Sequence, residues 1–207
     1  MSSVEAMIPP VPVTPLPAPQ YRYSPEEYLA FERGSIEKHE YFDGRIFAVV
    51  GASRAHNLIT VNLIAFLHLQ LGDRPFEIYP SDMRVKVRET GLYTYPDISV
   101  VSGEPQFADD EFDMLLNPTL IVEVLSTSTE EYDRGGKFEH YRQVPSLQMY
   151  LLVSQSKRDV ELRTRQPDGS WTVSRFPPSG PVVPLSAMGC DLPLDEIYRR
   201  VSLTAES

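Results

Sequence analysis

The alternation of apolar and polar residues along this chain predicts a mixed α/β fold. Apolar side chains cover nearly every helical face of residues 54–71, a stretch long enough to favour a helix over a strand and apolar enough to be buried against a sheet. Continuous β-rich runs at 97–101 and 119–125 are typical of strands covered on both faces. Further strands are predicted at 76–79 and 83–88. The pattern therefore indicates a central mixed sheet flanked by helices.

Capping residues mark two more helices. Ser24, followed by proline and two acids, begins a short helix over 25–33, and Gly34 ends it. Polar residues with helical spacing predict a longer helix over 126–144, which Pro145 stops. Together with residues 54–71, these segments supply the helices of the predicted fold.

A turn signal predicts a β-hairpin near the N-terminus. Asp43-Gly44 supplies positive φ at both central positions of a type I′ turn, and it separates candidate strands at 38–42 and 45–50. Later in the chain, a strand pair is predicted at 147–154 and 159–165, and short strands alternate with proline turns over 171–201.

Proline content separates the N-terminal residues from the rest of the chain. Prolines stand at positions 9, 10, 12, 15, 17 and 19, a density that blocks helices and sheet ladders. We therefore expect residues 1–20 to be a disordered tail. The remaining length suits one hydrophobic core, so residues 21–202 are predicted to form a single domain.

Charge and cysteine content exclude several classes of protein. The formal net charge of −10 argues against a broad basic surface for nucleic acid, so any contact with DNA is expected to be local. Cys190 is the only cysteine, which excludes an intramolecular disulfide and a thiolate zinc site. With no apolar run of membrane-spanning length and no secretory signal pattern, the chain is expected to be cytoplasmic.

Two carboxylates stand within apolar strand segments. Asp97 opens one predicted strand and Glu123 lies inside another. Burying an ionised carboxylate costs several kcal/mol unless a cation or strong donors compensate, so a metal ion is a natural partner for Glu123. The alternative is that Glu123 faces outward or pairs with a buried arginine.

A polar stripe is predicted on the helix that follows. Asp133, Lys137 and Tyr141 are spaced by four residues and fall along one helical face. Gly135 and Gly136 lie between them, which suggests the close approach of another backbone or of a ligand. An ordinary Asp–Lys surface pair is the simpler alternative.

These residues lie within a longer series of motifs. In order along the chain, they are Glu40-Tyr-Phe-Asp-Gly-Arg-Ile, His56, Tyr95-Pro96-Asp97-Ile-Ser-Val-Val, Val122-Glu123-Val124-Leu125-Ser126, the stripe of Asp133, Lys137 and Tyr141, and Val144-Pro145-Ser146-Leu147-Gln148. The series resembles the Uma-type family of restriction-endonuclease-like proteins in the PD-(D/E)XK nuclease superfamily, over roughly residues 21–202. The resemblance implies a restriction-endonuclease-like α/β core with a central mixed sheet, flanking helices and extra C-terminal strands.

The resemblance also implies a site. Asp97 and Glu123 would bind a divalent cation with help from Glu40 and the backbone carbonyl of Val124, and Lys137 would complete the site. Leu125 departs from the superfamily pattern, because it stands where the lysine of the Glu-x-Lys signature is usual, and Lys137 on the next helix matches its replacement. Met149 replaces an acid expected in many relatives, but it lies outside the proposed site.

The implied chemistry explains the residue types. Oxygen ligands suit Mg²⁺ or Mn²⁺, and the metal would polarise a phosphate and activate a water. Lys137 would orient that water or offset charge on the phosphoryl oxygens, and Asp133 would position Lys137. The expected activity is hydrolysis of DNA phosphodiester bonds, with DNA contact dependent on the metal. Superfamily resemblance also implies a homodimer.

Other polar residues have weaker predictions. His56 stands in the first turn of the 54–71 helix and is predicted either to contact a phosphate or to serve as a structural cap. Ser126 is expected to cap the following helix or to bind a ligand. His68 and His140 are expected to be structural, and His39, next to Glu40 on a strand, is expected to face the opposite way.

Two other classes of function compete with the nuclease. The fold could be retained as a non-catalytic module that binds DNA or protein in a mobile-element or defence system. Alternatively, the domain could be a structural interaction module with the proline tail as its ligand, which predicts no metal binding.

Overall fold

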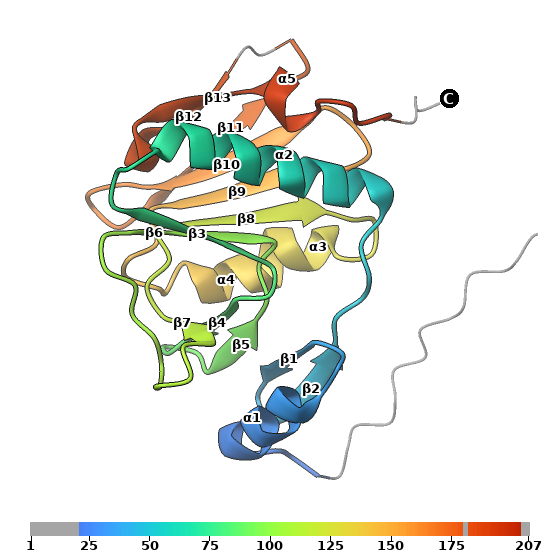
Figure 1. The fold of residues 1–207 in the computed structure, drawn as a ribbon, viewed down its shortest axis with the longest axis vertical. Helices are drawn as coiled ribbons and strands as arrows, with labels where there is room; N and C mark the ends of the chain where they lie inside the picture. The colour runs from blue at the N-terminus through green and yellow to red at the C-terminus, as the bar shows by residue number, and fades with distance from the viewer. Residues whose placement is uncertain (1–20, 180–181, 204–207) are drawn as a thin grey trace, which may run out of the picture.

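A six-stranded mixed sheet forms the centre of the molecule (Figure 1). The computed structural model describes residues 21–179 and 182–203, so the predicted tail at 1–20 lies outside the described residues. All neighbouring strands in this sheet are antiparallel except β8 and β9, which are parallel. From edge to edge the strands are β11 (Trp171–Phe176), β10 (Val160–Arg165), β9 (Met149–Ser154), β8 (Leu120–Leu125), β6 (Ile98–Ser102) and β3 (Phe76–Pro80). The predicted central mixed sheet is confirmed.

Helix α2 (Arg54–Leu71) covers one face of this sheet. Its buried residues recur every four positions, at Ile59, Leu63, Leu67 and Leu71, so one stripe of the helix packs on the strands. The same core cluster includes the C-terminal elements, which are β12 (Val182–Leu185), the 3₁₀ turn η2 (Ser186–Met188), β13 (Cys190–Pro193) and α5 (Leu194–Ile197). The buried helix predicted at 54–71 is therefore confirmed.

The other face is covered by the segment between β8 and β9. It consists of α3 (Glu130–Tyr132), the π-helical turn η1 (Asp133–Lys137) and α4 (Phe138–Tyr141). Because side chains alternate along a strand, Leu120, Val122 and Val124 of β8 join the core under α2. Ile121 and Leu125 join the core under α4. Glu123 stands between these two residues on the same face of β8.

The single helix predicted over 126–144 is wrong in its continuity. Residues 126–129 form a turn, in which the N–H groups of Thr129 and Glu130 both bond to the carbonyl of Ser126. The π turn then interrupts the α-helical ladder, and the hydroxyl of Tyr150 donates to the carbonyl of Asp133 at 2.8 Å. A side chain that satisfies a helix carbonyl from outside accompanies this kind of break, and π turns are frequent at functional sites.

A second sheet has five strands, in the order β2 (Arg45–Ala48), β1 (His39–Phe42), β5 (Leu92–Thr94), β4 (Arg84–Val87) and β7 (Met114–Leu115). The strands β5 and β7 were not predicted, because runs of three and two residues are too short for a pattern. Asp43 and Gly44 have φ angles of 47° and 75°, which confirms the type I′ hairpin.

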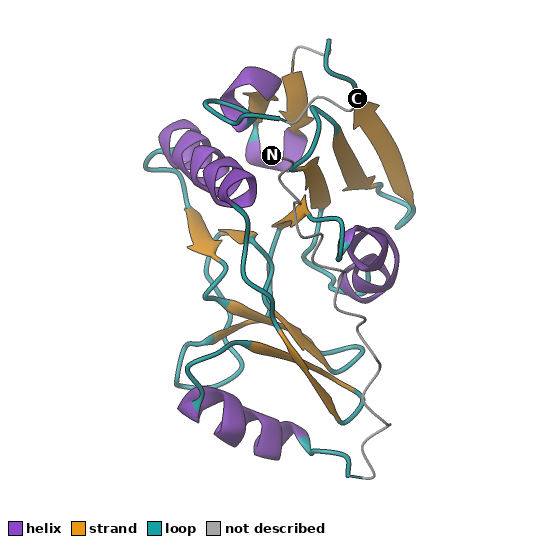
Figure 2. Cartoon of the chain, turned by 90° about the vertical axis from the view of Figure 1, so that its right-hand side faces the viewer, coloured by secondary structure: helices purple, strands orange, loops and turns teal. Residues whose placement is uncertain are grey.

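Helix α1 (Pro25–Gly34) packs against the second sheet through Tyr28, and Ser24 is its N-cap as predicted, within a capping box completed by Glu27. Figure 2 shows this sheet and α1 as the part of the molecule farthest from α5. Within the described part of the chain, no helix is long and apolar enough to cross a membrane.

Candidate active site

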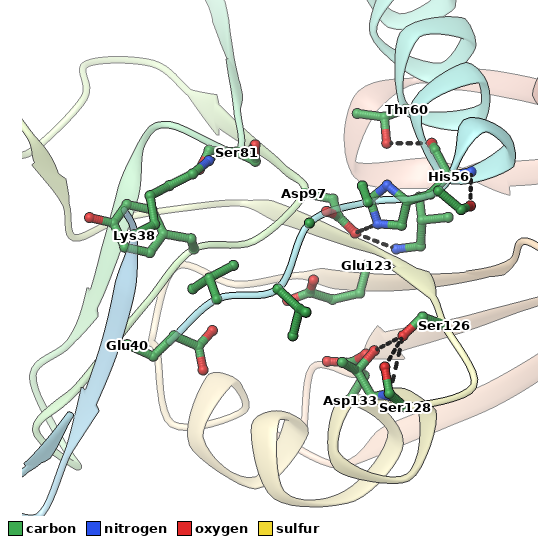
Figure 3. A pocket seen from close by; sticks show the side chains of 18 of the residues that line it. Lys38, Glu40, His56, Thr60, Ser81, Asp97, Glu123, Ser126, Ser128 and Asp133 are labelled. Atoms are coloured by element: carbon green, nitrogen blue, oxygen red, sulfur yellow. Dashed lines mark hydrogen bonds and ion pairs between the residues drawn. The ribbon is translucent and has the colours of Figure 1, made fainter. Parts of the chain in front are cut away.

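A pocket of about 760 Å³ lies where the two sheets meet, beside the C-terminal end of β8 (Figure 3). Its walls come from β1, the loop after β2, the first turns of α2, and the segment from Ser126 to Lys137. The predicted site residues that line it are Glu40, His56, Asp97, Glu123, Val124, Ser126, Asp133 and Lys137. Residues separated by about a hundred positions in sequence therefore meet in one cavity.

Lys137 is the centre of a buried charge cluster. Its Nζ lies 3.0 Å from Glu123 Oε1, 3.3 Å from Glu40 Oε1 and 3.5 Å from Asp133 Oδ1. The side chains of Lys137 and Glu123 are only 8% and 5% exposed. One ammonium therefore faces three carboxylates away from bulk water.

Hydroxyl groups hold these carboxylates in place. The hydroxyl of Tyr141 donates to Glu123 Oε1 at 3.0 Å, and the hydroxyl of Thr94 donates to Glu40 Oε1 at 2.5 Å. Both donors are buried. In the predicted stripe, Lys137 and Tyr141 thus contact Glu123 and Asp133 contacts Lys137, although the stripe lies on a π turn and α4 rather than on one regular helix.

Asp97 has its own set of partners. It immediately precedes β6, and its Oδ2 accepts the backbone N–H of Val124 at 2.7 Å. His56 Nε2 lies 3.1 Å from the same oxygen. The backbone N–H of His56 bonds to Ser53 Oγ, the N-cap of α2, at 3.1 Å. His56 is therefore fixed by the helix cap, and its ring contacts Asp97 (Figure 3).

Burial dominates the electrostatics of the cluster. Burial raises the pKa of Glu123 well above its usual value; Lys137 opposes this shift, and the negative charges of Asp133 and Asp97 add to it. Burial also raises the pKa of Asp133. For Lys137, burial favours a lower pKa, but the charges of Glu123, Glu40 and Asp133 outweigh burial and raise it. Lys137 is therefore an ammonium, and this single positive charge faces three carboxylates.

The donor set fits a hard divalent cation in part. Among the described residues, no group of three or more His, Cys, Asp or Glu side chains is arranged to hold a metal ion. Glu40 and Glu123 meet at Lys137, whereas Asp97 meets His56, so the predicted set of Glu40, Asp97 and Glu123 does not surround one point. Mg²⁺ usually needs only one or two carboxylates, with water and substrate phosphate completing its shell. Asp97 and Glu123 line the same pocket and meet that smaller requirement.

The remaining predicted residues have local roles. Ser126 Oγ accepts the N–H of Thr129 at 3.2 Å, which caps the turn before α3. A Cβ on Gly136 would lie 2.9 Å from the ring of Tyr132, so this glycine allows an aromatic side chain, rather than another backbone, to approach. A Cβ on Gly135 would meet nothing within 4 Å, so close approach does not explain that glycine.

The other three histidines do not line the pocket, as expected for His68 and His140 and for a His39 that faces away from Glu40. His39 Nδ1 lies 3.0 Å from Glu32 Oε2, and His140 packs edge-to-face on Phe42. His68 accepts the Gly72 N–H at its carbonyl, at the end of α2.

Two residues that support the site were missed by sequence reasoning. Thr94 lies in the short strand β5, and its only signal is its place just before Tyr95-Pro96-Asp97. Tyr150 lies inside the apolar run of β9, where its hydroxyl is hidden by the pattern of its neighbours. Both donate hydrogen bonds to residues far away in sequence.

A solved structure supports the fold. The crystal structure of a protein from Anabaena variabilis ATCC 29413, described as a putative nuclease belonging to DUF820, superposes with a TM-score of 0.68. The superposition covers 84% of this chain and 96% of that chain, at 17% sequence identity. At this identity the match shows the fold, which is restriction-endonuclease-like, as predicted.

Sequence comparisons give the relatives of the chain. It is 42% identical over 184 residues to the uncharacterized protein slr1290 of Synechocystis sp. strain PCC 6803, covering 88% of this chain and 94% of the relative. It is 43% identical over 150 residues to the uncharacterized protein sll1609 of the same organism, covering 72% and 85%. The family model Uma2, described as putative restriction endonuclease, matches residues 25–195. The chain therefore belongs to the Uma2 family.

Proposed function

We propose that this protein is a metal-dependent endonuclease that hydrolyses DNA phosphodiester bonds. The observation that carries the proposal is the convergence of Asp97, Glu123 and Lys137 in one pocket. The family match, described as a putative restriction endonuclease, supports the same reaction class.

Asp97 and Glu123 would hold Mg²⁺ or Mn²⁺, with the carbonyl of Val124 as a further oxygen ligand. When bound, the cation supplies a Lewis acid for the phosphate and lowers the pKa of a water. The Val124 N–H and the His56 ring both contact Asp97 Oδ2, so they fix the direction in which this carboxylate presents its oxygens. The Tyr141 hydroxyl does the same for Glu123.

Lys137 would act on the phosphate and the attacking water. Its ammonium is a compact charge with three donors, which suits the negative oxygens that develop during phosphoryl transfer. Glu40 and Asp133 keep this ammonium at the pocket and keep it protonated. Glu40 therefore serves in this proposal as a partner of Lys137, since it contacts the ammonium and does not share one point with Asp97 and Glu123.

The wider setting of the activity is also proposed. DNA is the partner, and its contact should depend on metal because five carboxylates line the pocket. We further propose a homodimer, as the superfamily resemblance implies, and a cytoplasmic location, which the single cysteine favours. Light scattering at several protein concentrations tests the dimer.

Cleavage assays with matched variants test the proposal. Plasmid and single-stranded DNA are incubated with Mg²⁺ or Mn²⁺ and either the native protein, Glu123→Gln or Lys137→Met. We expect each substitution to abolish most cleavage. Glu139→Gln is the control for Glu123→Gln, because its side chain is 64% exposed and outside the pocket. Cleavage that survives Glu123→Gln unchanged would exclude this site.

Metal titration gives a readout that is independent of cleavage. Calorimetry with Mg²⁺ or Mn²⁺ should show binding by the native protein, and Asp97→Asn should weaken that binding.

A non-catalytic module with the same fold is the alternative function. The observation that favours it is the direct contact of Lys137 with three carboxylates. That alternative predicts DNA affinity that is equal with and without metal.

A further inference from the structure

Tyr132 has an unusual position at the edge of the pocket. It lines the pocket, and 42% of the residue is exposed to solvent. Its ring lies against the backbone of η1, because a Cβ built on Gly136 would be 2.9 Å from both Cδ2 and Cε2 of the ring. Any side chain at Gly136 would therefore displace the ring. The glycine keeps an aromatic ring at the mouth of the site, one helical turn before Lys137.

Exposed apolar side chains also lie at the mouth, beside polar residues such as Glu37 and Asn57. Val49 and Val50, in the loop after β2, are 38% and 78% exposed, and Ile36, in the loop before β1, is fully exposed. All three line the pocket together with Tyr132. The surface around the acidic floor thus offers apolar and aromatic contacts.

The pocket lining contains few cationic side chains that could bind the phosphates of a duplex. The pocket lining includes two lysines and no arginine. Lys38 is paired with Asp82 at 2.8 Å, and Lys137 is paired with carboxylates of the floor. Duplex binding depends on Lys and Arg that neutralise many phosphates. Since Lys and Arg hold the phosphates of duplexes and single strands alike, this scarcity leaves contacts to the bases as the main source of affinity.

The chemistry also lies below the surface. The Glu123 and Lys137 side chains are 5% and 8% exposed, and that of Asp97 is 17% exposed. A duplex keeps its bases stacked inside a wide cylinder, so its bases are not available to a protein ring. An unpaired strand is narrower and exposes base faces, which stack on aromatic side chains without sequence preference.

We propose that the substrate of this site is single-stranded DNA, with one unpaired base stacked on Tyr132 and the adjacent phosphate directed to the pocket floor. This inference rests on the proposed function, because it names the substrate class of the same site. Tyr132 is a binding residue in this account, and Gly136 positions it.

Binding to a short fluorescent single strand, measured by anisotropy in Ca²⁺, tests the inference with the full chain. The native protein should bind the single strand more tightly than a duplex of the same sequence. Loss of one stacked base weakens binding by about tenfold, so Tyr132→Ala should raise the dissociation constant by about that factor. Tyr132→Phe keeps the ring and should bind as the native protein does.

The two glycines supply a matched pair. Gly136→Ala should weaken single-strand binding like Tyr132→Ala, because the new methyl group displaces the ring. Gly135→Ala should have no effect, because its methyl group meets nothing within 4 Å. Thermal unfolding of each variant confirms that it is folded.

Several outcomes would overturn the inference. They are equal or tighter binding of the duplex, no binding of the single strand, or unchanged single-strand affinity in both Tyr132→Ala and Gly136→Ala. The proposed function fails separately, through cleavage that survives Glu123→Gln. Cleavage of duplex DNA that needs Glu123 but not Tyr132 would keep the nuclease and refute the single-strand preference.

Discussion

Replacing Lys137 by methionine should destabilise the protein strongly. The substitution keeps the length of the side chain but removes the ammonium that lies 3.0 Å from Glu123 and 3.3 Å from Glu40. Three carboxylates would then face one another in a buried site with no cation. Tyr141 would still donate one hydrogen bond to Glu123, which is too little to replace a charge.

The expected loss follows from the burial of the pair. Removing one partner of a buried ion pair typically costs about 3–5 kcal/mol, because the other charge is left uncompensated. Both Lys137 and Glu123 are more than nine-tenths buried, so this range applies with little screening by solvent. For a protein of this size, such a loss lowers the melting temperature by about 6–20 °C.

The loss should also depend on pH. Burial raises the pKa of Glu123, and without Lys137 nothing comparable lowers it. The folded variant then holds a proton that the unfolded chain releases near the ordinary carboxyl value of 4.5. Stability of Lys137→Met should therefore be greatest below that pH and fall as pH rises toward the raised pKa, by at most about 1.4 kcal/mol per pH unit.

Urea unfolding followed by Trp171 fluorescence measures these changes. Trp171 is the only tryptophan, and its ring contacts Phe138 of α4 with centroids 5.2 Å apart. The double variant Glu123→Gln/Lys137→Met removes a charge from each side of the pair. Its free energy of unfolding should exceed that of Lys137→Met alone by at least about 1 kcal/mol. This prediction would be refuted if Lys137→Met unfolded at the same urea midpoint as the native protein. It would also be refuted if the double variant were no more stable than Lys137→Met.

Two further predictions concern the fold outside the pocket. Burial lowers the pKa of His140, which packs on Phe42, so the native state binds this proton less readily than the unfolded chain. The contribution of the neutral His140 ring to stability is present above about pH 6.5 and declines as the pH falls below that value. His140→Leu should therefore flatten this part of the pH–stability curve. An unchanged curve would contradict the lowered pKa of His140. Gly44→Ala should cost about 1–2 kcal/mol, because its φ is +75° and the new Cβ would lie 2.7 Å from Arg22 Cβ. Gly34→Ala is the control, since its Cβ meets nothing within 4 Å, and equal melting temperatures for the two variants would show that the turn is not under this constraint.

The sequence alone determined the features that depend on neighbouring residues. The capping box at Ser24, the type I′ turn at Asp43-Gly44 and the buried helix over 54–71 follow from local spacing and backbone preference. The apolar run of β8 also surrounds Glu123 with buried neighbours, so the sequence itself demands a compensating partner for this carboxylate.

The tertiary structure decided which groups meet. That Lys137 contacts Glu40 and Glu123, while Asp97 contacts His56, depends on the packing of two sheets across a pocket, which no local pattern encodes. The break of the predicted 126–144 helix also has a partner from a distant strand, since the Tyr150 hydroxyl bonds to the Asp133 carbonyl. Local sequence fixes dihedral preferences and buried faces, whereas the partners of buried charges are chosen by contacts between residues far apart in the chain.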